Sequence, residues 1–156
     1  QAIYGQVTWN PPALRELKLT LGGRYTKDDK DGVLYLTNNA PSRCPPTVLT
    51  APLCTLDLKT KRFNPLAIVS YDITPQHHVY AKYATGYRSG GASSRSVTYR
   101  QFGPEDVKSY EIGAKTEWLD RRLRVNFAGY VMNRTGSQVD FSSVVPTLAG
   151  NRNTLE

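Results

Sequence analysis

Ser109-Tyr-Glu-Ile-Gly-Ala-Lys-Thr-Glu-Trp118 is the clearest strand pattern in the sequence. Successive side chains of an extended chain point to opposite faces. One face then carries Tyr110, Ile112, Ala114, Thr116 and Trp118, and the other carries Ser109, Glu111, Gly113, Lys115 and Glu117. A helix would place Glu111, Lys115 and Glu117 beside Ile112 and Trp118, which leaves no continuous apolar stripe. The stretch is therefore predicted to be a β-strand with one face for lipid or a core and one face for water.

The same alternation recurs along the chain. Residues 3–10, 17–26, 78–88 and 122–131 repeat it, and a weaker strand is predicted between Phe63 and Tyr71, where Leu66 and Ile68 intrude on the polar face. A short last strand is predicted near residues 138–142. The fold class is therefore all-β, with about seven strands.

The connections between these strands alternate in length. Asn10–Ala13, Thr74–Gln76 and Leu119–Arg122 are short and carry the Pro, Asn or Asp that turns favour. Lys27–Arg62 and Ser89–Asp106 are long and polar. An antiparallel meander with short turns at one end and long loops at the other is typical of transmembrane barrels, whose short turns face the periplasm.

Five motifs follow one another through most of the chain. They are Gly22-Gly23-Arg24-Tyr25-Thr26, Tyr71-Asp72-Ile73-Thr74-Pro75, Gly86-Tyr87-Arg88-Ser89-Gly90-Gly91, Pro104-Glu105 with Tyr110-Glu111-Ile112-Gly113-Ala114-Lys115, and Leu119-Asp120-Arg121-Arg122-Leu123. Each motif is weak alone, but in order and spacing they resemble the C-terminal barrel of TonB-dependent outer-membrane receptors.

The resemblance implies uptake of ferric siderophores or similar large nutrients across the outer membrane of a Gram-negative bacterium. It implies a barrel of about 22 strands with a plugged lumen, so about seven strands are expected to be an incomplete segment of a large transmembrane β-barrel. Residues 1–156 are then a partial barrel, and the plug domain is absent from them. The implied partners are outer-membrane lipid, the nutrient ligand, and the TonB energy-transducing complex acting through the missing plug.

Three alternatives remain open. A closed eight-stranded barrel would need one more strand between Val33 and Thr60, for which Val33-Leu34-Tyr35-Leu36 is the candidate. The chain could also be a small structural or adhesive outer-membrane barrel without active transport, or a soluble lipocalin-like binder with its apolar faces turned inward. A plug encoded upstream of Gln1 would favour the receptor over the structural barrel.

Composition agrees with a barrel. Only 39% of residues are hydrophobic, and no apolar run approaches the ~20 residues of a membrane-spanning helix. Trp9 and Trp118 lie beside short turns on the apolar face, where an interfacial girdle would place them, although ordinary sheet packing explains them nearly as well.

Cys44 and Cys54 are the two cysteines, and both lie in the long Lys27–Arg62 connection. In an exported protein such a pair is normally bridged, so a disulfide is predicted. A metal site is the weaker alternative, because no His or Asp lies beside the pair to complete it.

The formal net charge is +7, but no nucleic-acid-binding module is present and nucleic acid is not expected as a partner. The most basic loop follows Arg88 and contains Arg95 and Arg100, with no acid before Glu105. These three arginines are a candidate outer-loop site for an anionic ligand, against the plainer interpretation of a solvated loop.

No catalytic, cofactor-binding or metal site is predicted, and the chain is not expected to be an enzyme. His77 and His78 are adjacent and would point to opposite faces of a strand. Glu111 and Glu117 share a face but lie ~20 Å apart along a strand, beyond the ~5–10 Å of a carboxylate pair.

Overall fold

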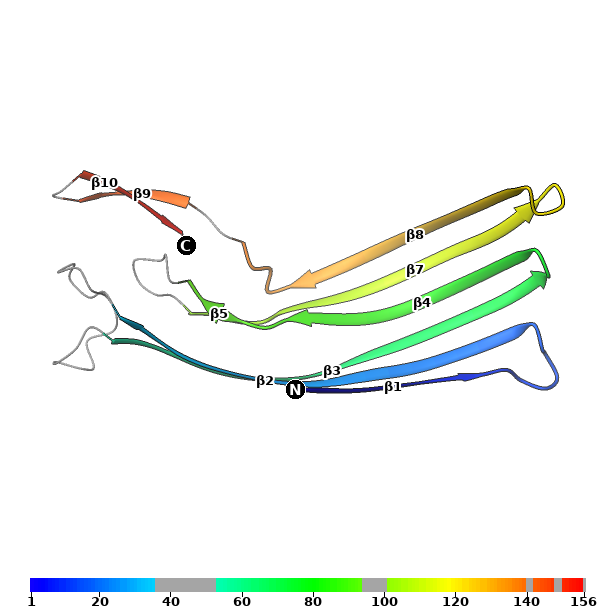
Figure 1. Ribbon diagram of the computed structural model, residues 1–156, viewed down its shortest axis with the longest axis horizontal. Helices are drawn as coiled ribbons and strands as arrows, with labels where there is room; N and C mark the ends of the chain where they lie inside the picture. Colours follow the sequence, from blue (N-terminus) through cyan, green and yellow to red (C-terminus); the bar gives the residue numbers. More distant parts are fainter. Residues whose placement is uncertain (36–52, 94–100, 140–141, 148–149, 156) are drawn as a thin grey trace. The chain divides into compact units, whose positions relative to one another are not determined.

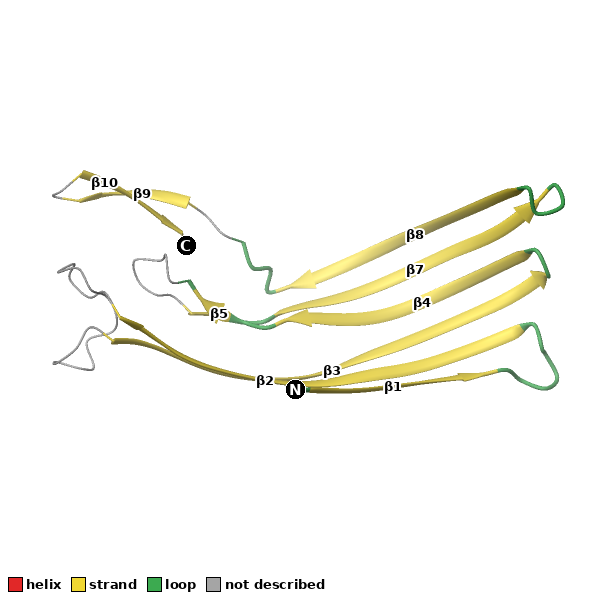
Figure 2. Cartoon of the chain, viewed as in Figure 1, coloured by secondary structure: helices red, strands yellow, loops and turns green. Residues whose placement is uncertain are grey.

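The computed structural model describes residues 1–35, 53–93, 101–139, 142–147 and 150–155. All regular structure in these residues is β-strand, as Figures 1 and 2 show. A six-stranded sheet has the order β1-β2-β3-β4-β7-β8, and two short hairpins pair β5 with β6 and β9 with β10. The strands are β1 (Ala2–Trp9), β2 (Leu17–Tyr35), β3 (Leu53–Thr74), β4 (His77–Arg88), β5 (Gly91–Ala92), β6 (Gln101–Phe102), β7 (Glu105–Trp118), β8 (Leu123–Thr135), β9 (Ser142–Thr147) and β10 (Gly150–Leu155). The prediction of an all-β antiparallel meander is confirmed.

The chain divides into two units. The first comprises Gln1–Lys27, Lys61–Tyr87 and Asp106–Thr135, and the second comprises Asp28–Thr60, Arg88–Glu105 and Gly136–Glu156. In the first unit, three short turns join β1 to β2, β3 to β4 and β7 to β8 and lie together at one end of the strands (Figure 1). These are the three short connections predicted from the sequence.

The register of the first unit places residues of like polarity opposite one another. Trp9 pairs with Leu19 across β1 and β2, Val69 with Ala81 across β3 and β4, and Trp118 with Leu123 across β7 and β8. Paired residues project from the same face of a sheet. Each hairpin therefore gathers its apolar side chains on one common surface.

Two backbone hydrogen bonds set the register between hairpins. Asp72 N donates to Glu16 O at 3.0 Å, and Glu117 N donates to Gln76 O at 2.9 Å. Continued along regular antiparallel ladders, these bonds place Tyr25 opposite Phe63 and Tyr83 opposite Tyr110. The Tyr83 and Tyr110 rings indeed lie 5.1 Å apart between centroids.

The β7–β8 turn has an unusual backbone. Leu119, Asp120 and Arg121 have φ angles of 53°, 53° and 68°, and the turn closes through a hydrogen bond from Arg122 N to Leu119 O. Side chains with a Cβ atom rarely adopt these values because Cβ crowds the following carbonyl oxygen. We therefore infer that the pairing of β7 with β8 holds the turn in this conformation.

In the second unit, Gln138 is hydrogen-bonded to three residues of the earlier segment 88–105. Its backbone N–H donates to the Glu105 carboxylate, and its side-chain amide donates to Ser89 O at 3.2 Å and Gly103 O at 2.9 Å. Residues 137–139 form a loop, and the next strand begins at Ser142. The predicted strand near 138–142 is therefore wrong over its first residues, because the Gln138 backbone N–H, which a strand ladder would need, donates to the Glu105 carboxylate instead.

The long Lys27–Arg62 connection was also predicted incorrectly at both ends. Strand β2 continues to Tyr35 and β3 begins at Leu53. The charged run Asp28–Asp31 resembles a loop in sequence, but a strand with both faces in water tolerates it. The candidate strand at Val33 extends β2 and does not form a separate element. The six-stranded sheet keeps two edges, β1 and β8, in the described part of the chain, so a closed eight-stranded barrel is not what it forms.

Candidate functional site: a sheet with two unlike faces

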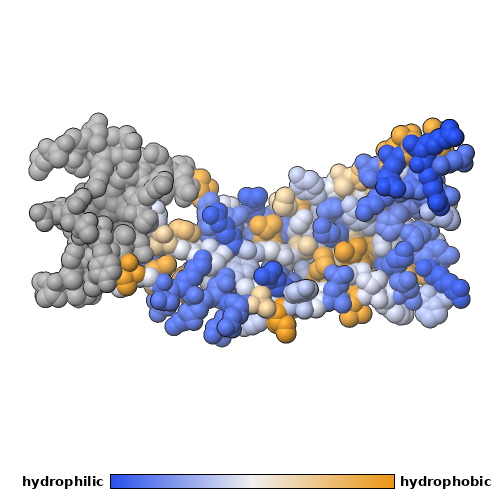
Figure 3. Space-filling model, viewed as in Figure 1, coloured by the Kyte–Doolittle hydropathy of each residue, from blue (hydrophilic) through white to orange (hydrophobic). Residues whose placement is uncertain are grey.

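The sheet of the first unit has almost no core of its own. Ala114 is the one buried hydrophobic residue among those described, while Val7 is 71% exposed and Ile112 and Phe127 are each 67% exposed. The space-filling view shows hydrophobic patches along the strands and a mostly hydrophilic turn end (Figure 3). An exposed apolar surface of this extent marks contact with a membrane or a partner.

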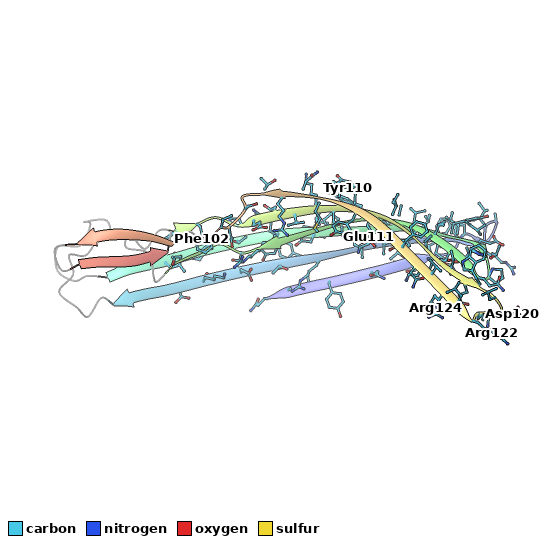
Figure 4. All side chains as sticks on the ribbon, turned by 90° about the horizontal axis from the view of Figure 1, so that it is seen from above. Phe102, Tyr110, Glu111, Asp120, Arg122 and Arg124 are labelled. Atoms are coloured by element: carbon cyan, nitrogen blue, oxygen red, sulfur yellow. The ribbon has the colours of Figure 1, made fainter. Side chains whose placement is uncertain are left out.

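Side chains on the polar face are paired with one another. Tyr80 Oη donates to Glu111 Oε1 at 2.7 Å, and Lys82 Nζ lies 3.3 Å from Glu111 Oε2. Lys115 Nζ lies 6.0 Å from the centroid of the Tyr80 ring. Figure 4 shows Glu111 beside Tyr110 on β7. On the polar face, these side chains thus link β4 to β7.

A second cluster lies near the turn end of the same face. Asp72 Oδ2 accepts from Lys18 Nζ at 2.8 Å, and Asp72 Oδ1 contacts His78 Nδ1. These residues come from β2, β3 and β4. Because the Asp72 carboxylate contacts both neighbours, the cluster holds three adjacent strands together.

Two further ion pairs involve arginine. Arg62 Nε and Nη2 contact the two oxygens of Asp106 at 3.0 and 3.2 Å, which is the bidentate geometry that guanidinium favours. Arg124 contacts Glu117 at 2.6 Å next to the β7–β8 turn, where Figure 4 labels Asp120, Arg122 and Arg124. Together with the Lys18–Asp72 and Lys82–Glu111 pairs, the Arg124–Glu117 pair gives the polar face ion pairs near the turns and in the middle of the strands.

Gly113 makes the polar network possible. A Cβ atom at this position would lie 2.7 Å from the Tyr80 ring and from its hydroxyl oxygen. The ring of Tyr80 therefore lies directly against the Gly113 backbone, from where its hydroxyl reaches Glu111. A side chain at position 113 would occupy this space.

Aromatic side chains border the apolar face at both ends. Trp9 and Trp118 lie next to the turns, and Trp118 contacts the His77 ring edge-on at 4.7 Å between centroids. Tyr25, Phe63, Tyr83 and Tyr110 lie toward the opposite ends. Tyr110 and Trp118 are eight positions apart on β7, which is ~26 Å along a strand or ~20 Å along the membrane normal at a tilt of about 40°. This height is comparable to the apolar band of an outer-membrane barrel.

Both aromatic borders cross the sheet at the same angle to the direction of the hydrogen bonds between strands. On the turn side, the residue of β7 that lies level with Trp9 of β1 is Ile112, four strands away, and Trp118 is six residues beyond it. The opposite border moves four residues from Tyr25 to Tyr110 over three steps. At ~3.3 Å per residue and ~4.8 Å per strand, both slopes are about 45°, close to the strand tilt of transmembrane barrels.

The structure places only some of the predicted site residues. Arg88 ends β4 and is exposed. Arg95, Arg100 and Cys44 lie outside the described residues. Cys54 falls within β3, but its side chain is outside what the structure describes. The anionic-ligand site and the disulfide therefore remain predictions.

Sequence analysis missed the residues that the fold brings together most clearly, namely the Asp72 cluster and the Tyr80–Glu111–Lys82 network. The signal in the sequence is that charged residues occupy alternate positions, on the same face of neighbouring strands. That signal becomes a contact only once the register between hairpins is known. Among the described residues, no three His, Cys, Asp or Glu side chains are grouped as metal ligands would be. No helix in that same part of the chain could cross a membrane.

An antiparallel sheet with one exposed apolar face, aromatic borders and a paired polar face is the wall of a transmembrane-type β-barrel. The family model for the β-barrel of TonB-dependent receptors matches residues 1–154, and the chain belongs to this family.

Relatives and a solved structure agree with this assignment. The chain is 30% identical over 135 residues to the ferric-pyoverdine 358 receptor of Pseudomonas putida, covering 86% of this chain and 15% of that receptor. It is 29% identical over 113 residues to a ferric-pyoverdine receptor of Pseudomonas sp. strain M114, covering 71% and 12% of the two chains. The crystal structure of the Escherichia coli K12 ferric-catecholate import receptor Fiu has a similar fold, with a TM-score of 0.56 and 23% identity over 98% of this chain and 22% of that one. The chain thus spans about 15% of the length of the P. putida receptor it matches.

Proposed function

We propose that residues 1–156 form part of the wall of an outer-membrane receptor that takes up ferric siderophores in a Gram-negative bacterium. The observation that carries the proposal is the separation of the two faces in a chain that belongs to the TonB-dependent receptor family. The apolar face would meet lipid, and the paired polar face would line the lumen. The names of the ferric-pyoverdine relatives support a ferric siderophore as the ligand class.

In this proposal the chain contributes wall and loops, and no catalytic step is assigned to it. A plug elsewhere in the full-length receptor would close the lumen and receive energy from TonB. The polar face suits a lumen wall because several of its charges are paired within the sheet, as in Lys18–Asp72 and Lys82–Glu111. Paired charges can face a water-filled or plug-filled lumen without the large desolvation penalty of isolated ones.

Uptake measurements in the source organism test the proposal. The full gene would be deleted, and uptake of radioactive iron supplied as a ferric siderophore would be compared with the parent strain under iron limitation. We expect uptake to fall in the deletion strain, to return with the wild-type gene, and to be lost when TonB is removed. Equal uptake in both strains for pyoverdine and catecholate complexes, with slower growth on a limiting carbon source, would assign a different nutrient.

A further inference from the structure

Hydrogen bonds join three parts of the second unit that are distant in sequence. The first is the arm, which is the end of β2 and the beginning of β3, residues 28–35 and 53–60. The second is the loop base, residues 88–92 and 101–105, which contains the β5–β6 ladder. The third is the segment that follows β8, residues 137–139. Contacts between these parts decide whether they move together.

The loop base is closely packed within itself. Its two sides form the β5–β6 ladder, in which Gly91 is paired with Phe102. A Cβ atom on Gly90 would lie 2.3 Å from Phe102 O and 2.9 Å from the backbone carbonyl carbon of Gly103, so the two main chains are in direct contact there. Glycine is the residue that allows backbones to approach this closely. Because neither side can shift without displacing the other, we expect the loop base to move as one body.

The arm holds both sides of the loop base. Lys30 Nζ of β2 donates to Gly90 O at 3.0 Å, on the side that enters the loop. The Gln101 side chain, on the side that leaves the loop, donates to Thr55 O of β3 at 3.1 Å. The Leu58 side chain packs against Gly90, since its Cδ2 atom would lie 3.1 Å from a Cβ atom there. A displacement of the arm therefore acts on both sides of the loop base.

Gln138 also holds both sides of the loop base. Its side-chain amide donates to Ser89 O at 3.2 Å on one side and to Gly103 O at 2.9 Å on the other. Its backbone N–H donates to the carboxylate of Glu105, a residue that is only 8% exposed. Hydrogen bonds to a charged group contribute more than neutral ones, and a low local dielectric strengthens them further. The segment after β8 is thus attached to the same body as the arm, through different atoms.

We infer that the loop base is a joint that couples the arm to the segment after β8, with Lys30 and Gln138 as the positioning residues on its two sides. Loosening of either attachment then loosens the other, because coupling between two sites is reciprocal. A ligand that displaces one of these parts would displace the others with it. The inference goes beyond the proposed function, since it concerns how successive loops respond together and requires no particular ligand.

Hydrogen–deuterium exchange of the full-length receptor in detergent, without ligand, tests the joint. Gln138→Met keeps the size of the side chain and removes its amide donor, so exchange at residues 137–139 should become about fivefold faster. The joint also predicts exchange about two- to fivefold faster at residues 55–60 of the arm. Lys30→Met should accelerate exchange at residues 137–139 by a similar factor, as reciprocal coupling requires.

Lys59→Met is the matched control. It removes a lysine of the same arm whose ion pair with Asp57 is exposed, so exchange at residues 137–139 should stay unchanged. All variants would first be checked for folded mobility on gels.

Three results would overturn the joint. The first is acceleration confined to the side that carries the substitution, and the second is no change in either variant. The third is equal acceleration around the β7–β8 turn, at residues 115–125 of the first unit, which would mean general destabilisation. The proposed function is tested separately, because loss of iron uptake on gene deletion does not depend on how the loops are coupled.

Discussion

Tyr80 donates its phenolic hydrogen to Glu111 at 2.7 Å across the boundary between β4 and β7. The next residue on β7, Ile112, pairs with Gly129 and lies on the opposite, exposed face. One step along the chain therefore separates a paired polar wall from an apolar surface. Substitutions on each face of the sheet test this division in the full-length receptor.

Removing the Tyr80–Glu111 hydrogen bond should weaken the β4–β7 boundary. Tyr80→Phe and Glu111→Ala should each lower the unfolding midpoint, and the double variant should lose less than the sum because both remove the same interaction. The midpoint is measured by heating the receptor and following the shift from folded to unfolded mobility on gels. Tyr83→Phe, on the other face, is the matched control; additive losses for the two polar variants would show that the bond contributes nothing.

A side chain at Gly113 should displace Tyr80. Gly113→Val would place Cβ 2.7 Å from the ring, so we expect a loss of about 1–3 kcal/mol from overpacking. Chemical denaturation of the receptor in lipid vesicles measures the loss. A smaller residue at position 80, Tyr80→Ala, should restore part of the stability in the double variant. Gly129→Ala is the control, because a Cβ atom there meets nothing within 4 Å, and an equal effect at both glycines would contradict the steric argument.

Arginine substitutions at adjacent positions of β8 should differ in severity. Phe127 pairs with Ala114 on the apolar face, whereas Asn126 pairs with Lys115 on the polar face. Phe127→Arg should cost about 2–4 kcal/mol if the residue lies near the bilayer midplane, while Asn126→Arg should cost little. Denaturation of the receptor folded into vesicles compares the two.

A fluorescent label on a single cysteine decides between lipid and an apolar interior. A lipid-soluble nitroxide should quench the label at position 127 more than a water-soluble quencher does, with the order reversed at position 126. Strong water access at 127 would mean that this strand does not line a membrane barrel.

Glycine should relieve the backbone of the β7–β8 turn. Leu119 has a φ of 53° and is exposed, so its side chain adds strain without contributing to a core. The left-handed conformation costs ~1–2 kcal/mol for a residue with a Cβ atom, and glycine avoids this cost. Glycine also makes the unfolded chain more flexible, which lowers the free energy of unfolding by about 0.4–1 kcal/mol. Leu119→Gly should therefore stabilise the receptor by about 0.5–1 kcal/mol in the same denaturation assay. Ala13→Gly, in the β1–β2 turn, should have the opposite sign because Ala13 is not among the positive-φ residues.

The predicted Cys44–Cys54 disulfide should be detectable by peptide mapping. Digestion without reductant should release the two cysteines in one linked peptide, which reduction separates. Closing this loop should contribute on the order of 2–3 kcal/mol. Alkylation of both cysteines in the folded, unreduced receptor would show that they are free thiols.

The strands and the two faces of each strand could be predicted from the sequence alone. Alternation at Tyr110, Ile112, Ala114 and Trp118 is a consequence of local backbone geometry, since each residue of an extended chain turns its side chain by half a rotation. The turns were equally local, because Pro11, Pro75 and Asp120 act on their own backbone. The division between an apolar and a polar face, and the family resemblance it supported, therefore needed no coordinates.

The contacts between side chains of different hairpins could not be predicted from the sequence. The Tyr80–Glu111 hydrogen bond, the Lys18–Asp72 pair and the space above Gly113 depend on the register between strands of different hairpins. This register also decided where β2 ends, since the partner strand β3 continues the ladder through a charged run that resembles a loop. Register follows from hydrogen bonds between residues distant in sequence, whose energies depend on every strand in the sheet, so the pattern of any one strand does not contain it.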